Sequence, residues 1–130
     1  MSWTIGDVSG RSGVPVETIR YYEREGIIPR PPRSTSGRRV YEPADLKTLT
    51  FIRNARELGF NLEEVRSLLA LRGPDNCCTD VKAIAQNHLE RVRAQKARII
   101  EVEHILSDAV ARCPGGRTVH CTLLRILEQA

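Results

Sequence analysis

At 130 residues and a net charge of +4, the chain suits one small domain with an appended element and is too short for a large catalytic fold. Its two Phe, one Trp and three Tyr leave a core built mainly from Leu, Ile, Val and Ala, which favours packed helices over a β-sandwich. Without a run of about eighteen apolar residues, or a basic start followed by an apolar stretch, we expect no membrane contact and a cytoplasmic location.

The first predicted elements are two short helices joined by a tight turn. Helix signals over residues 5–12 end at Gly13, which begins a turn. A second helix is predicted over 16–25, with Ile19 facing the core and Gly26 at its C-terminal cap. Because a helix, a short glycine-containing turn and a second helix form the helix-turn-helix motif, this region is predicted to bind DNA.

The next segment is predicted to be a small two-stranded wing followed by two more helices. Prolines within 29–32 exclude a helix, and turn residues then lead into the β-favouring run 38–41. Pro43 suits the first turn of a third helix that reaches about Leu58, and Asn61 is predicted to cap a fourth.

A single long helix is predicted from Thr79 or Asp80 to about Arg112, because this stretch contains neither Pro nor Gly. Its three-four spacing is typical of a coiled-coil seam, which needs a partner helix and indicates a homodimer, parallel or antiparallel. The seam positions are Ala85, His88, Val92, Gln95, Ile99, Val102, Leu106 and Ala109. A loop over 113–121 and a short terminal helix over 122–128 follow.

Basic residues concentrate in the N-terminal half. Between Arg11 and Arg56 there are ten Arg or Lys against five Asp or Glu, as a surface that binds DNA phosphates requires. Tyr22 is the aromatic side chain most readily assigned to the core. The residues expected to contact double-stranded DNA are Thr18, Arg20 and Tyr21 on the second helix and Arg33, Arg38 and Tyr41 in the wing.

Six ordered segments together resemble the MerR family of bacterial regulators: TIGDVS (4–9), GVPVETIRYYE (13–23), GI (26–27), PPR (31–33), GRRVY (37–41) and FIRNARELGF (51–60). The resemblance covers essentially the whole chain. It implies a dimer whose long helices pair antiparallel and which binds a palindrome between poorly spaced promoter elements. The effector-bound form is expected to bend and untwist that DNA so that RNA polymerase engages.

The expected fold is therefore mainly α, a winged helix-turn-helix followed by a long antiparallel coiled-coil helix and a short C-terminal loop and helix. We divide the chain by expected role. The ranges are 1–72 for the DNA-binding domain, 73–79 for a linker, 80–112 for the dimerisation helix, and 113–130 for a metal-binding loop and terminal helix.

The four cysteines are predicted to be metal ligands or a redox switch, since a reducing compartment disfavours structural disulfides. Cys78 and Cys113 bracket a helix that would separate them by roughly 50 Å, so they cannot meet within one chain. In an antiparallel dimer, Cys78 of one subunit would lie beside Cys113 and Cys121 of the other. Two equivalent three-thiolate sites would result.

Three thiolates suit Hg(II), Pb(II), Cd(II), Zn(II) or Cu(I) rather than Mg or Ca. The family's copper-group sensors carry Ser where Cys78 stands, so the resemblance implies a divalent ion. The spacing of Cys113 and Cys121 resembles the copper-group sensors, however, and the Cys77-Cys78 pair resembles lead and cadmium sensors. Cys77 and His120 are further candidate ligands.

The predicted function is activation of a metal resistance or efflux operon by a DNA-binding regulator that responds to Hg, Pb, Cd or Zn. One alternative is a thiol-redox regulator in which Cys113 and Cys121 form a disulfide. Another is a Cu(I) sensor. An enzyme is not expected, because no nucleophile-base set, phosphate loop or pair of catalytic carboxylates stands out.

Overall fold

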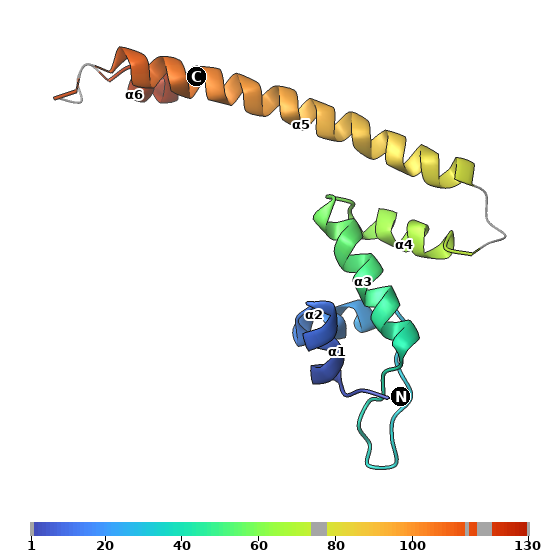
Figure 1. The fold of residues 1–130 in the computed structure, drawn as a ribbon. Coiled ribbons are helices and arrows are strands. Elements are labelled where there is room, and N and C mark those ends of the chain that lie inside the picture. The colour runs from blue at the N-terminus through green and yellow to red at the C-terminus, as the bar shows by residue number, and fades with distance from the viewer. Residues whose placement is uncertain (1, 74–77, 114, 117–120, 130) are drawn as a thin grey trace. The chain divides into compact units, whose positions relative to one another are not determined.

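A computed structural model describes residues 2–73, 78–113, 115–116 and 121–129 of the chain. The architecture is mainly helical, as predicted, and within these ranges β-structure is limited to isolated bridges. The helices in chain order (Figure 1) are α1 Ile5–Ser12, α2 Val16–Arg24, α3 Pro43–Glu57, α4 Leu62–Ala70, α5 Cys78–Arg112 and α6 Thr122–Glu128.

The helix boundaries follow from local capping chemistry. The Thr4 hydroxyl accepts a hydrogen bond from the Asp7 amide, and the Asp7 carboxylate accepts one from the Thr4 amide, both at 3.1 Å. The left-handed Gly13, with φ of 76°, ends α1. Asn61 and Glu64 form the same reciprocal pair at the start of α4, so the predicted cap at Asn61 is confirmed.

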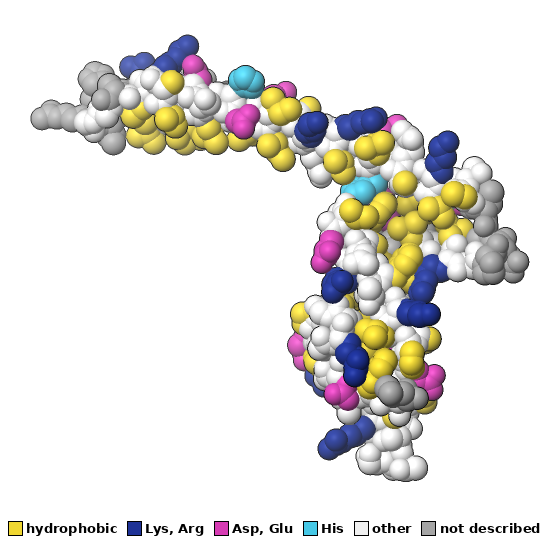
Figure 2. Space-filling view, in the orientation of Figure 1, with side chains coloured by type: hydrophobic (Ala, Val, Ile, Leu, Met, Phe, Trp, Pro, Cys, Tyr) yellow, Lys and Arg dark blue, Asp and Glu magenta, His cyan; other side chains and the backbone are white. Residues whose placement is uncertain are grey.

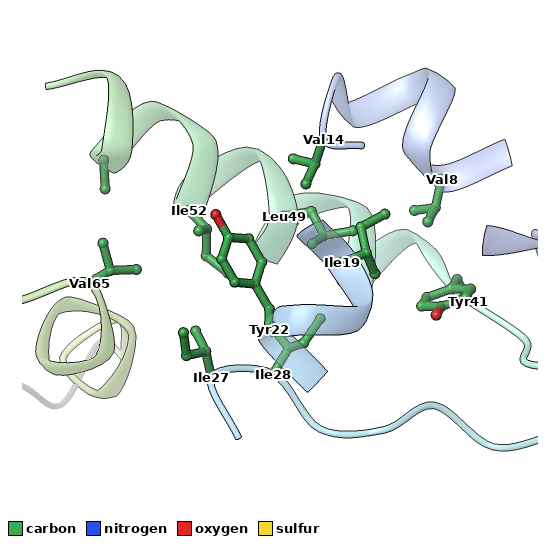
Figure 3. Close-up of a cluster of buried hydrophobic side chains, with 11 residues drawn as sticks. Val8, Val14, Ile19, Tyr22, Ile27, Ile28, Tyr41, Leu49, Ile52 and Val65 are labelled. Atoms are coloured by element: carbon green, nitrogen blue, oxygen red, sulfur yellow. The ribbon is translucent and has the colours of Figure 1, made fainter. Parts of the chain in front are cut away.

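Helices α1 to α4 enclose one hydrophobic core. α1 packs on α2 and α3, and α3 packs on α4. Figure 3 shows side chains from these helices and their connections turned toward one another. Each such side chain, once buried, contributes about 1.5–3 kcal/mol. The buried cluster consists of Val8, Val14, Ile19, Tyr22, Ile27, Ile28, Tyr41, Leu49, Ile52, Ala55 and Val65.

The predicted wing is a hairpin held by single bridges rather than by regular strands. Arg33 pairs with Arg39 inside the hairpin, and Trp3 pairs with Tyr41 at its base. The Trp3 amide donates to the Tyr41 carbonyl at 2.7 Å, and the Tyr41 amide donates back at 2.8 Å. Proline at positions 31 and 32 explains the short pairing, because proline has no amide hydrogen to offer a ladder.

The chain divides into two compact units, Met1–Ile84 and Ala85–Ala130. In the described part of the second unit, only His88 and Ala109 are buried. Figure 2 shows hydrophobic side chains exposed along the C-terminal half of α5. The exposed large hydrophobic residues of this unit are Leu89, Val92, Ile99, Ile100, Val102, Ile105, Leu106, Val110, Leu124 and Leu127.

Helix α5 begins at Cys78, inside the segment 73–79 that was expected to be a linker, and residues 74–77 lie outside the described ranges. The division by role into 1–72, 73–79, 80–112 and 113–130 stays a prediction. Among the described residues, every helix is too short or too polar to cross a membrane.

Candidate functional site

Helix α2 has one face in the core and one face in solvent. Ile19, Tyr22 and Glu23 are buried, as their three-four spacing dictates. Burial raises the pKa of the Tyr22 hydroxyl above its usual 10.0, which agrees with a core role for this ring. The outward face carries Arg20 and Tyr21, two of the three side chains predicted to contact DNA on this helix.

The outward side chains of α2 are held by local contacts but stay accessible. Arg20 Nη1 lies 3.0 Å from Glu17 Oε1, one helical turn away. The Arg24 guanidinium lies over the Tyr21 ring, 6.0 Å from its centroid. Thr18, the third predicted contact residue, is half-buried, so its hydroxyl is less accessible to DNA than the side chains of Arg20 and Tyr21.

Arginines of α2 and the wing converge on one open cleft of about 600 Å³. Arg20 comes from α2, and Arg33, Arg38 and Arg39 come from the wing. The rest of the lining comes from Thr4, Ile5 and Gly6 at the start of α1. The four arginines make this cleft a favourable place for phosphate groups, and two of them, Arg20 and Arg39, also pair with Glu17 and Glu23.

Thr18 lies outside the arginine cleft. It lines a smaller hollow of about 270 Å³ beside the turn of the helix-turn-helix, together with Tyr22, Arg53 and Arg56. The structure thus gathers three of the six predicted DNA-contact residues, Arg20, Arg33 and Arg38, around a single cleft.

The expected contact of Tyr41 with DNA needs correction. The Tyr41 side chain is 1% exposed, and its hydroxyl donates to Glu23 Oε2 at 2.9 Å. Burial, and next the hydrogen bond and negative charge of Glu23, raise the pKa of Tyr41 to about 12. The ring faces inward because the backbone of Tyr41 pairs with Trp3, so its hydroxyl cannot reach a phosphate.

Two residues that sequence reasoning missed are Glu23 and Arg39. Arg39 Nη1 lies 2.5 Å from Glu23 Oε1, and the Glu23 side chain is 1% exposed. The signal was present in the sequence, because Glu23 follows Ile19 by four residues and therefore lies on the apolar face of α2. A carboxylate on such a face indicates a buried partner.

The described cysteines lie at element boundaries. Cys78 is the first residue of α5 and is exposed, Cys113 follows its last residue and is exposed, and half-buried Cys121 precedes α6. Cys77 and His120 lie outside the described residues. Within the part of the chain that is described, no three His, Cys, Asp or Glu side chains gather into a metal-binding group.

On the predicted seam of α5, His88 is buried and its Nδ1 lies 3.0 Å from Arg91 Nη2. Ile99, Val102 and Leu106 line an open apolar groove of about 490 Å³. This exposed apolar groove suits a helix surface that packs against another helix.

Two family models match the chain. The model described as MerR HTH family regulatory protein matches residues 3–71, and the model described as MerR, DNA binding matches residues 46–109.

Similar proteins include regulators named for metals. The HTH-type transcriptional regulator ZntR of Escherichia coli strain K12 is 37% identical over 131 residues, with 98% of this chain and 93% of that protein covered. The mercuric resistance operon regulatory protein of Bacillus cereus is 34% identical, with 98% of each covered. The crystal structure of the transcription regulator PbrR691 from Ralstonia metallidurans CH34 in complex with lead(II) shares 33% identity and a TM-score of 0.80, covering 96% of this chain and 98% of that chain.

Proposed function

The chain belongs to the MerR family of helix-turn-helix regulatory proteins, and we propose that it is a metal-responsive activator of transcription. In this proposal a homodimer binds a palindromic promoter site and distorts it when a thiophilic divalent ion binds. The regulated genes form a metal resistance or efflux operon. Since the target is bacterial promoter DNA and the second partner is RNA polymerase, we assign its action to the cytoplasm.

The DNA-binding part of the proposal is supported by the arginine cleft. Arg20 from the outward face of α2 lies beside Arg33 and Arg38 of the wing, so one surface combines a recognition helix with phosphate-binding groups. Tyr21 is 38% exposed on the same helix and offers a hydroxyl to a base edge or a phosphate. We assign the base-reading role to this helix and the backbone contacts to the wing.

The dimer is supported by the unpaired apolar surface of α5. A helix of 35 residues extends over roughly 52 Å, too long to bury its seam on a domain of this size. Antiparallel pairing of two copies would cover the groove at Ile99, Val102 and Leu106. The same pairing would bring Cys78 of one subunit to Cys113 and Cys121 of the other.

The metal is proposed from the chemistry of the donor set. Cys78, Cys113 and Cys121 supply three soft thiolates, which suit Hg(II), Pb(II), Cd(II) or Zn(II). Cys77 and His120 are proposed as further ligands. A bound ion would supply a link between thiolates of two chains. The chain's own part is to hold these thiols at helix ends, so that cross-linking changes the spacing of the DNA-binding domains and bends the promoter.

One observation carries this proposal: Cys78 begins the 35-residue helix α5, Cys113 follows its last residue, and Cys121 precedes α6. The test is transcription by purified RNA polymerase from the promoter that the protein occupies in its cell, with Hg(II), Pb(II), Cd(II) or Zn(II) added singly. We expect at least one ion to raise transcription under reducing conditions. Silence with all four ions contradicts the proposal.

Two further outcomes separate the alternatives. Activation that strictly requires an oxidant, with no metal retained by the reduced protein, would favour a redox switch between Cys113 and Cys121. X-ray absorption of the loaded dimer gives the metal-sulfur distance and coordination number. A linear two-sulfur site would contradict the three-thiolate proposal, and three sulfurs would support it.

A further inference from the structure

A buried carboxylate connects the recognition helix to the wing. Glu23 projects from the apolar face of α2, and its two oxygens have different partners. Oε1 lies 2.5 Å from Arg39 Nη1, and Oε2 accepts the Tyr41 hydroxyl at 2.9 Å. Both partners belong to the returning arm of the wing. Among the described residues, the polar side-chain contacts between α2 and the wing all end on Glu23.

The two partners of Glu23 fix the orientation of its carboxylate group. A carboxylate that is 1% exposed is stable only when paired, because its lost hydration must be replaced by hydrogen bonds. With a guanidinium on one oxygen and a hydroxyl on the other, the carboxylate group cannot turn without leaving one partner unsatisfied. The wing is therefore held to α2 by a charged group of defined orientation.

The wing has few other attachments. Its hairpin is closed by the Arg33–Arg39 bridge and by an Arg33 side chain that donates to the Gly37 carbonyl at 3.2 Å, contacts internal to the wing. At its base, the backbone of Tyr41 pairs with Trp3. The buried Tyr41 ring also packs in the core and fixes the base of the wing, and the Glu23 contacts link the returning arm of the wing to α2.

We infer that Glu23 is a positioning residue for DNA binding: it holds the wing so that Arg33 and Arg38 face the same phosphates as Arg20. This inference rests on the proposed function, because it concerns the same DNA-facing surface. Arg20, Arg33 and Arg38 line one cleft only while the wing keeps this position. Glu23 never touches DNA, since its side chain is buried; it acts through the groups that do.

The test is a double-mutant cycle in the full-length protein, with the operator duplex from the occupied promoter as the probe. Glu23→Gln is nearly isosteric, but it removes the negative charge and replaces one carboxylate oxygen by an NH2 group, which cannot accept a hydrogen bond from the partner at that position. In the otherwise native protein we expect operator affinity to fall about tenfold. In an Arg33→Ala/Arg38→Ala background, the same change should cost less than about twofold, because the wing there no longer binds phosphates.

The salt dependence of binding gives a readout that a reduced stability would not move. If Glu23→Gln withdraws the wing from the DNA, the negative slope of log affinity against log salt becomes shallower, by about 0.9 for each phosphate that the wing no longer neutralises. A general decrease in folded protein would lower affinity equally in both backgrounds and leave the slope unchanged. That result would overturn the inference.

Tyr41→Phe is the second variant, in case Glu23→Gln does not fold. It keeps the buried ring and removes only the hydroxyl that Glu23 holds. Since Tyr41 is 1% exposed, any effect on DNA binding must be indirect. We expect a smaller decrease in affinity with the same dependence on the wing arginines; equal decreases in both backgrounds would count against the inference. Failure of the unaltered protein to bind its promoter would instead overturn the proposed function.

Discussion

The two units of the chain differ in how far they bury their apolar side chains. Met1–Ile84 places eleven hydrophobic side chains in its own core, whereas the described part of Ala85–Ala130 buries only His88 and Ala109. The first unit is a small domain that buries its apolar side chains within a single chain. The second is mostly one helix, and a helix alone has no opposing surface on which to pack its apolar stripe.

The contrast indicates which part of the chain would pack against the proposed second copy. Ile52 is fully buried within its unit, while Ile99 is 67% exposed on α5. Both are isoleucines on helices, so only tertiary context separates them. The stability of the first unit should therefore be a property of one chain, and that of the second should depend on protein concentration.

The largest effect is expected from Ile99→Asp. A carboxylate in the seam of a helix pair would be buried without a partner, which costs about 3 kcal/mol or more and weakens association by a hundredfold or more. The dimer should dissociate into monomers in sedimentation equilibrium. Operator affinity should fall with it, because the two halves of a palindrome would no longer be bound together.

The matched control for that change is Ala97→Asp. Ala97 is exposed, and two residues along a helix it lies about 200° around the axis from Ile99. The Ala97→Asp substitution introduces the same acid on the other side of α5 and should leave the dimer intact. Equal dissociation of both variants would mean that Ile99 is not in the interface.

The next largest effect is expected from Ile52→Ala, compared with Ile99→Ala. Removing a fully buried side chain leaves a cavity and should cost about 2–5 kcal/mol of unfolding free energy. The cost of Ile52→Ala should be independent of protein concentration. The cost of Ile99→Ala should shrink as the protein is diluted below its dimer dissociation constant. Urea denaturation at several concentrations distinguishes the two, and identical behaviour would remove the contrast between the units.

Replacing Cys78, Cys113 or Cys121 by Ser tests whether metal sensing is separate from DNA binding. Each change should weaken metal binding by about a hundredfold or more, since a hydroxyl is a poor ligand for thiophilic ions. Metal-dependent transcription should disappear while operator affinity stays within a few-fold of the original. Cys77→Ser is the comparison variant, and its metal affinity reports whether that thiol is a ligand. A large decrease in operator affinity in any of the first three would contradict separate roles for the cysteines and the DNA-binding surface.

The smallest effect concerns the core of the first unit at high pH. Tyr41 has a pKa of about 12 in the folded chain against an ordinary value of 10.0, so the folded state holds this proton more tightly. The resulting stability is complete below about pH 10 and is lost as pH rises toward 12, by about 2.7 kcal/mol at most. Tyr41→Phe should flatten urea-unfolding stability across that window. Some slope should remain, because the pKa of Tyr22 is also raised. An unchanged slope would mean that the hydroxyl titrates as in the unfolded chain.

Much of this fold was predictable because its signals are local. The cap at Asn61, the stop at Gly13 and the start of α3 at Pro43 each depend on residues within one helical turn. The exposed Arg20, Arg33 and Arg38 were predictable for a related reason, since long cations in turn and helix positions seldom find room inside a small core.

Tyr41 was misassigned because its direction is not a local property. A tyrosine at the end of a β-favouring run can face solvent or core, and the choice depends on Trp3 and Glu23, which are 38 and 18 residues away. Arg39 was passed over for the same reason. It is identical in type to its neighbour Arg38, yet only Arg39 reaches the buried carboxylate.

Residue order alone was enough to define the helices, the basic half of the chain and the positions of Cys78 and Cys113 at the ends of α5, because these depend on short-range spacing and composition. The convergence of four arginines on one cleft, and the inward turn of Tyr41 onto Glu23, came from the folded chain. These features join segments far apart in sequence, and their energies depend on burial and on pairing across that distance.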